Sequence, residues 1–110
     1  MANNFRRKLS RSVGASAEIV GNYTVGAGNT AVIVGLTVTN ITGSAIAANV
    51  FLNNQTNNTS LVVNGPISSG SSLVIVGGDQ KVVLEAGDRI YVQSSAASSV
   101  DVIMSILEIS

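Results

Sequence analysis

TAVIVGLTVTN, residues 30–40, indicates the fold class of this chain more clearly than any other stretch. Successive side chains of a β-strand point to opposite faces, so residues two positions apart share a face. The first face would carry Val32, Val34, Leu36 and Val38, and the second would carry Ile33, Gly35, Thr37 and Thr39. We therefore predict a strand whose first face belongs to the core, and we expect an aspartate at Val34 or Leu36 to unfold the protein.

Short runs rich in β-branched residues continue on both sides of this strand and are divided by Gly, Asn and Ser. They recur at intervals of roughly 8–12 residues, which is typical of β-sandwiches and small barrels. Loops of hairpin length favour antiparallel pairing. We predict an all-β fold, namely a single antiparallel β-sandwich of the jelly-roll or Ig-like type with roughly seven to nine strands, over residues 15–110.

The last run, residues 100–109, is apolar on both of its faces. One face would carry Val100, Val102, Met104 and Ile106, and the other would carry Ile103, Leu107 and Ile109. Strands that are covered on both faces have near-continuous apolar sequences, and exposed apolar patches mark contacts between proteins. We therefore expect this strand either to be covered on both faces or to lie in a subunit contact.

The opening MANNFRRKLSRSVG, residues 1–14, differs from the rest of the chain in its clustered charge. It holds four of the six basic residues, whereas residues 12–110 hold two bases and all six acids, a formal charge of −4. Phe5, Leu9 and Val13 recur at a spacing of four, which predicts a short helix that ends at Gly14. We predict a basic N-terminal arm over residues 1–14, and its expected partner-binding residues are Phe5, Arg6, Arg7, Lys8, Leu9 and Arg11.

Several interpretations of this arm stay open. A nucleic-acid arm would neutralise a few phosphates, but no set of aromatic residues accompanies it for base stacking. An organelle presequence, a membrane-surface helix and a solvated, disordered terminus are further readings. We favour an assembly arm that docks on an acidic protein surface, so deleting residues 1–13 should leave a folded body that no longer incorporates.

Catalytic chemistry has little support in the composition. The chain contains no Cys and no His, which excludes thiolate metal ligands, disulfides and the usual general base near neutral pH. Asp79, Glu85 and Asp88 are close in sequence, yet we assign them to turns, where Asp bonds the local backbone. The longest apolar stretch, residues 31–38, is too short to span a bilayer. We predict that the protein is not an enzyme, and we expect no catalytic residues, no metal site and no cofactor.

Three segments carry a family resemblance. They are MANNFRRKLSRSVG at residues 1–14, TAVIVGLTVTN at 30–40, and SSLVIVGGDQKVVLEAGDRIYVQSSAASSVDVIMSILEI at 71–109. Together they resemble small virion structural proteins of tailed bacteriophages, notably phages of cyanobacteria and other marine bacteria. The phrase VLEAGDRIYV, residues 83–92, also resembles the leucine–glycine–aspartate turn of trimeric jelly-roll proteins.

The phage resemblance implies a β-sandwich subunit present in many copies in the virion, assembled in the host cytoplasm. Its expected role is that of a capsid decoration or cement subunit, which stabilises the assembled particle through homo-oligomeric and arm-mediated contacts. A neck, tail or fibre-attachment component is the alternative, and a carbohydrate-binding β-sandwich module is a further one. We expect other copies of the chain as partners, in a trimer by jelly-roll analogy, and virion proteins such as the major capsid, neck or tail proteins. We expect neither nucleic acid nor a membrane as a partner.

Overall fold

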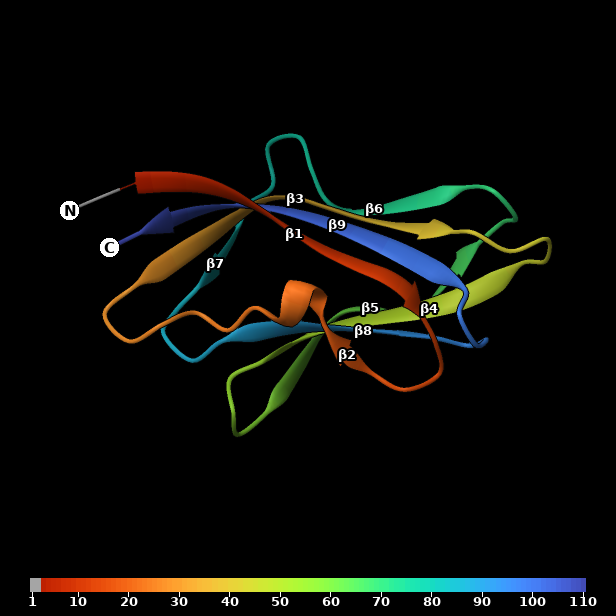
Figure 1. Ribbon diagram of the computed structural model, residues 1–110, viewed down its shortest axis with the longest axis horizontal. Helices are drawn as coiled ribbons and strands as arrows, with labels where there is room; N and C mark the ends of the chain where they lie inside the picture. The colour runs from red at the N-terminus through yellow and green to blue at the C-terminus, as the bar shows by residue number, and fades with distance from the viewer. Residues whose placement is uncertain (1–2) are drawn as a thin grey trace.

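The computed structural model describes residues 3–110, which form nine β-strands and one 3₁₀ turn (Figure 1). These elements are β1 (Asn3–Val13), β2 (Glu18–Ile19), η1 (Val20–Asn22), β3 (Thr30–Asn40), β4 (Ile46–Asn53), β5 (Asn58–Ile67), β6 (Ser72–Val76), β7 (Val82–Leu84), β8 (Arg89–Ser94) and β9 (Val100–Ile109). The strand content and the strand number confirm the prediction of an all-β fold.

The strands form two antiparallel sheets, which confirms the predicted sandwich. One sheet has the order β1-β9-β3-β6, with β7 paired to β3 beyond the end of β6. The other has the order β2-β8-β4-β5. The chain passes repeatedly from one sheet to the other, and its first and last strands pair with each other. Of the two predicted sandwich types, this wrapped order is that of a jelly roll.

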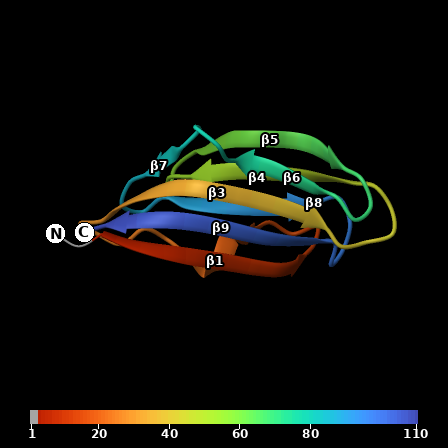
Figure 2. The same cartoon turned by 90° about the horizontal axis from the view of Figure 1, so that it is seen from above.

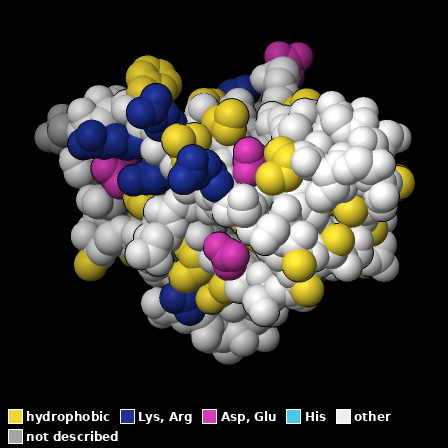
Figure 3. Space-filling model, turned by 45° about the vertical axis from the view of Figure 1, so that its right-hand side comes forward, with side chains coloured by type: hydrophobic (Ala, Val, Ile, Leu, Met, Phe, Trp, Pro, Cys, Tyr) yellow, Lys and Arg dark blue, Asp and Glu magenta, His cyan; other side chains and the backbone are white. Residues whose placement is uncertain are grey.

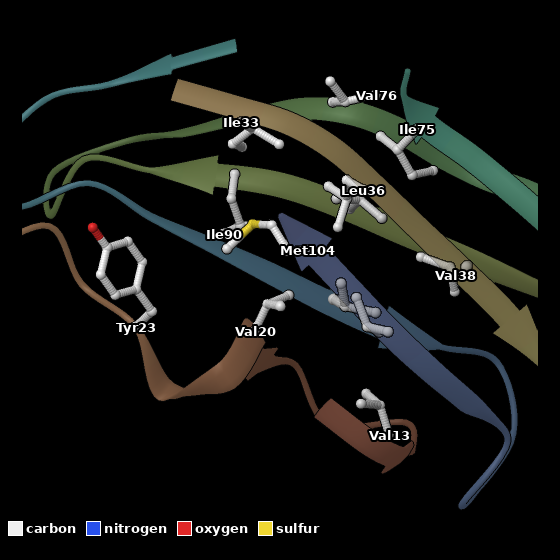
Figure 4. Close-up of a cluster of buried hydrophobic side chains, with 14 of the residues drawn as sticks. Val13, Val20, Tyr23, Ile33, Leu36, Val38, Ile75, Val76, Ile90 and Met104 are labelled. Carbon is white, nitrogen blue, oxygen red and sulfur yellow. The ribbon is translucent and has the colours of Figure 1, made fainter. Parts of the chain in front are cut away.

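The core fills the space between the sheets. Ile33, Leu36 and Met104 from the five-stranded sheet point toward Ile90 from the four-stranded sheet (Figure 4), and all four side chains are buried. Full burial of one such side chain contributes about 1.5–3 kcal/mol of hydrophobic stabilisation. Residues 100, 102, 104 and 106 of β9 are also buried, as the alternation in the last run predicts.

The predicted core face of β3 is wrong in its first half. Ile33 pairs with Ile106 of β9 while Gly35 pairs with Ser105, so two steps on β3 match one step on β9. A β-bulge of this kind moves the following side chains to the other face. Ile33 is therefore buried before the bulge and Leu36 after it, whereas Val34 is half-buried.

The predicted helix at the N-terminus is also wrong. Residues 3–13 form β1, which pairs with β9 along nearly its whole length. A spacing of four places residues on one face of a helix, but it also places them on one face of a strand. A short isolated helix is marginal in water, whereas the edge of β9 offers a row of backbone hydrogen-bonding partners. Tertiary pairing therefore decides the conformation of this segment.

Candidate functional site

The six residues predicted to bind a partner all lie on β1, the edge strand of the five-stranded sheet. The strand divides them between two faces. Phe5, Arg7 and Leu9 lie opposite Leu107, Ser105 and Ile103 of β9, on the face that points away from the core. Arg6 and Lys8 lie opposite the buried residues Ile106 and Met104, and Arg11 follows at an irregular stretch between Ser10 and Val13. The structure therefore brings Phe5, Arg7 and Leu9 together and separates Arg6 and Lys8 from them.

β1 is attached to the sandwich at several points. Val13 at its end is fully buried. The backbone N–H of Ser12 donates to Oδ1 of Asp101 at 2.9 Å, and the N–H of Gly21 in η1 donates to Oγ of Ser10 at 2.9 Å. Deleting residues 1–13 would remove a core side chain and a whole strand, so point substitutions are the cleaner test of this segment.

Lys8 and Tyr23 form a second attachment on the inner side of β1. The Lys8 ammonium lies 4.6 Å from the centroid of the Tyr23 ring, a cation–π contact. The Tyr23 hydroxyl donates a hydrogen bond of 2.8 Å to Oε2 of Glu108 on β9. Burial, together with the hydrogen bond and the negative charge of Glu108, raises the pKa of Tyr23 above its ordinary value. Lys8 therefore helps to hold β1 against the sandwich.

The face of the five-stranded sheet that points away from the core carries two rows of apolar side chains. We call it the outer apolar face, and the pairing registers define its rows. The first row crosses four strands through Leu9, Ile103, Thr37 and Val74. The second crosses them through Phe5, Leu107, Val32 and Val83. Between the rows, Arg7 lies beside Ser105 and Gly35.

Sequence reasoning found only part of this face. It identified Phe5 and Leu9, but it missed Val74 and Val83 because their short runs are apolar at every position and so do not show which side chains face outward. The two apolar faces of β9 were the available signal, since they predicted either a second cover or a subunit contact. Ile103 is 56% exposed, so within the described chain no second cover exists.

Basic side chains gather beside this face. Several Lys and Arg side chains cluster on one side of the molecule, with apolar side chains among them (Figure 3). The described strand β1 contributes Arg6, Arg7, Lys8 and Arg11 and contains no acid. The β1 margin of the sheet is therefore positively charged.

The structure shows no arrangement for catalysis in residues 3–110. An open groove of about 710 Å³ lies between β1 and the segment of residues 17–22, and its only acid is Glu18. No group of potential metal ligands occurs in the described residues. Asp88 accepts a hydrogen bond of 2.9 Å from the N–H of Glu85, which is the turn role predicted for it. None of the helical segments between residues 3 and 110 is long and apolar enough to cross a membrane.

Comparison with known proteins gives the fold. No protein-family model matches the chain, and no curated protein matches it in sequence. A structure of Bacillus endospore appendages, described as a family of disulfide-linked pili, is similar over 99% of this chain and 87% of that chain, with 15% identity and a TM-score of 0.57.

Two viral structures share the fold at comparable levels. The infectious bursal disease virus particle is similar over 96% of this chain and 30% of that chain, with 7% identity and a TM-score of 0.59. The virus-like particle of the extra small virus of the giant freshwater prawn Macrobrachium rosenbergii is similar over 98% and 79%, with 12% identity and a TM-score of 0.50. At these identities the likeness establishes a shared jelly-roll fold.

Proposed function

We propose that the protein is a non-enzymatic structural subunit of a virus particle, in which it assembles with copies of itself and with neighbouring virion proteins. The observation that carries this proposal is the apolar face of the five-stranded sheet beside a basic edge strand. Large exposed apolar patches mark interaction surfaces, and clustered charge of one sign favours an oppositely charged protein surface.

The shared fold supports the proposal. The named neighbours are parts of virus particles and of a pilus, which are assemblies of repeated subunits. The pili are described as disulfide-linked, whereas this chain contains no Cys. Disulfide bonds therefore cannot link copies of this protein, and the surface on the five-stranded sheet supplies candidates for non-covalent contacts.

The finer proposal is a decoration or cement subunit on the capsid of a tailed phage. Binding to the assembled shell alone stabilises the shell by mass action. A neck, tail or fibre-attachment role is the alternative within the same class. Carbohydrate binding has weaker support, because Phe51 and Tyr91 stack on each other at 5.2 Å between ring centroids and so cover one face of each ring.

Copy number in purified particles tests the proposal. Quantitative mass spectrometry of particles from the virus that encodes the chain should find it as a stoichiometric component. On the order of hundreds of copies supports capsid decoration, and on the order of tens supports the neck or tail. Particles that lack the chain would contradict the proposal.

Charge reversal tests the contribution of β1. Arg7→Glu should reduce incorporation by about tenfold or more, because it places an acid where the partner surface is acidic. Asn57→Glu introduces an acid at an exposed position in the turn between β4 and β5, on the other sheet, and is the control. Equal incorporation of both variants would remove β1 from the mechanism.

A further inference from the structure

The exposed apolar side chains of this protein are concentrated on one face. Residues 3–110 expose seven large hydrophobic side chains, and five of them lie on the outer apolar face. These five are Phe5 at 77%, Val74 at 64%, Val83 at 58%, Ile103 at 56% and Leu9 at 47% exposed. The registers place them in the two rows, where Thr37 joins Ile103 to Val74, and Leu107 and Val32 join Phe5 to Val83.

This face lacks a cover within the described chain. β1, β9, β3 and β6 lie side by side in this order (Figure 2), and the opposite side of the same sheet already packs on the core. An antiparallel sheet commonly leaves one face in water, but that face is then polar. In this protein the outer face of the five-stranded sheet carries two apolar rows, which favours a protein partner.

The two margins of this face have different charges. Strand β1 carries four bases and no acid, and Arg7 is the base on its outer face. The acids Asp101 and Glu108 lie on the neighbouring strand β9. The opposite margin, formed by β6, β7 and the turns beside β7, carries the exposed acids Asp79 and Glu85 and one base, Lys81. A second copy turned over onto the face therefore places opposite charges together if its β7 margin lies over β1.

The positions along the strands agree with this arrangement. The turn that contains Asp79 joins β6, which pairs with β3 from Leu36 onward, to β7, which pairs with β3 up to Ile33. Along the strand direction, Asp79 therefore lies at about the same height as Gly35. The registers place Arg7 at this height on the opposite margin, since Arg7 and Gly35 both pair with Ser105. Rotation about a two-fold axis parallel to the strands leaves the height of each residue along the strands unchanged. Arg7 of one copy would therefore approach Asp79 of the other.

The apolar rows match under the same operation. The first row has Leu9 at one end and Val74 at the other, and the second has Phe5 and Val83. The two-fold axis places each row of one copy over the same row of the second copy, with the order of the strands reversed. Leu9 would then contact Val74, and Phe5 would contact Val83, which buries apolar surface against apolar surface.

Edge-to-edge pairing is the competing arrangement, and the charges disfavour it. Two β1 strands that pair with each other would bring four bases against four bases. Basic residues on an edge strand oppose this kind of pairing. The face can therefore recruit a second copy, whereas the β1 edge repels one.

We propose that two copies of this chain pack through their outer apolar faces about a two-fold axis parallel to the strands, with the β1 margin of each over the β6–β7 margin of the other. This interface rests on the proposed assembly function, and it specifies one of the self-contacts in that assembly. A specific interface buries about 800 Å² from each partner, which is about a seventh of the 5766 Å² of accessible surface. One broad face of the sandwich supplies an area of this size.

Sedimentation of the purified chain tests the apolar contact. Val74→Glu and Ile103→Glu should each weaken self-association by about tenfold or more, because each places a charge inside the interface. Val63→Glu is the matched control, since Val63 on β5 is 65% exposed but lies outside this face. Circular dichroism should show that all three variants stay folded. Unchanged self-association in Val74→Glu and Ile103→Glu, or an equal loss in Val63→Glu, would overturn the proposal.

A charge exchange tests the arrangement of the two copies. Arg7→Glu and Asp79→Arg should each weaken the dimer, and the combined variant should recover most of the lost affinity. A combined variant that is no tighter than either single variant would overturn the proposed register.

The outcome for this interface and the outcome for the proposed function are separable. A chain that is monomeric at millimolar concentration and yet present in particles would overturn the interface and keep the function. A face-dependent dimer that is absent from particles would keep the interface and overturn the function.

Discussion

The two sheets of this sandwich have the same construction on the inside and different surfaces on the outside. The outer side of the four-stranded sheet pairs polar residues across strands, Asn49 with Gln93 and Asn53 with Arg89. The Arg89 guanidinium donates to Oδ1 of Asn53 at 3.2 Å and lies 5.9 Å from the Tyr91 ring centroid. The outer side of the five-stranded sheet presents apolar rows instead.

This contrast separates a surface that is complete in water from one that is not. On the four-stranded sheet, hydrogen bonds engage Asn53, Asn49 and Gln93, and the two aromatic rings cover each other. Its strands expose one large apolar side chain, Val63 on β5. On the five-stranded sheet, the same alternation places valine, isoleucine and phenylalanine in water, where their burial by a partner would be favourable. The difference is the reason why we propose the five-stranded sheet as the side through which copies assemble.

The largest expected effect comes from breaking the core that both sheets share. Leu36→Asp should destabilise the protein by about 4 kcal/mol or more, because it buries an unpaired charge. Val34→Asp, two residues away at the bulge, should cost about 2 kcal/mol or less because Val34 is half-buried. Urea denaturation measures both. Equal losses would contradict the bulge and the assignment of the two faces.

A smaller effect should come from loosening only the edge of the five-stranded sheet. Gly21 has a φ of 60°, and a Cβ there would lie 2.6 Å from Cβ of Lys8 on β1. Gly21→Ala should therefore cost about 2–3 kcal/mol and reduce the hydrogen-exchange protection of β1.

Gly28→Ala is the control for this variant. Gly28 has a φ of 81°, but a Cβ there meets nothing within 4 Å. Its cost should be the backbone strain alone, about 1 kcal/mol. If Gly21→Ala costs no more than Gly28→Ala, the close approach of η1 to β1 has no energetic role.

The smallest effect should come from removing one hydroxyl that joins the segment after η1 to β9. Tyr23→Phe deletes the hydrogen bond to Glu108 and should cost about 1 kcal/mol near neutral pH. The pKa of Tyr23 is raised in the folded state, so folding favours the neutral phenol. Its stabilisation is complete below the unfolded-state pKa near 10 and falls as the pH rises from there toward the folded-state pKa.

Unfolding free energies from pH 8 to 11 measure this difference. The unsubstituted protein should lose stability more steeply above pH 10 than Tyr23→Phe does. Parallel profiles for the two proteins would show that Tyr23 titrates normally in the folded state.

The strands of the sandwich interior were predictable because their local pattern and their tertiary environment agree. The alternation in residues 100–109 identified the buried face of β9 correctly, and its second apolar face pointed to the exposed Ile103. The sequence predicted that β3 is a strand. It did not predict which side chains of β3 point into the core, because the bulge at Val34 depends on pairing with β9. The partner-binding role of Phe5, Arg6, Arg7, Lys8, Leu9 and Arg11 stays a prediction.

The sequence by itself determined the fold class, because period-two alternation and closely spaced turn residues exclude a helical core whatever the chain packs against. It also determined the absence of cysteine and histidine chemistry. Only the tertiary structure decided that residues 3–13 form a strand, because a spacing of four suits both conformations and the free edge of β9 selects between them. Only the tertiary structure decided the outer apolar face, because side chains from five separate strands become neighbours through pairing across the sheet.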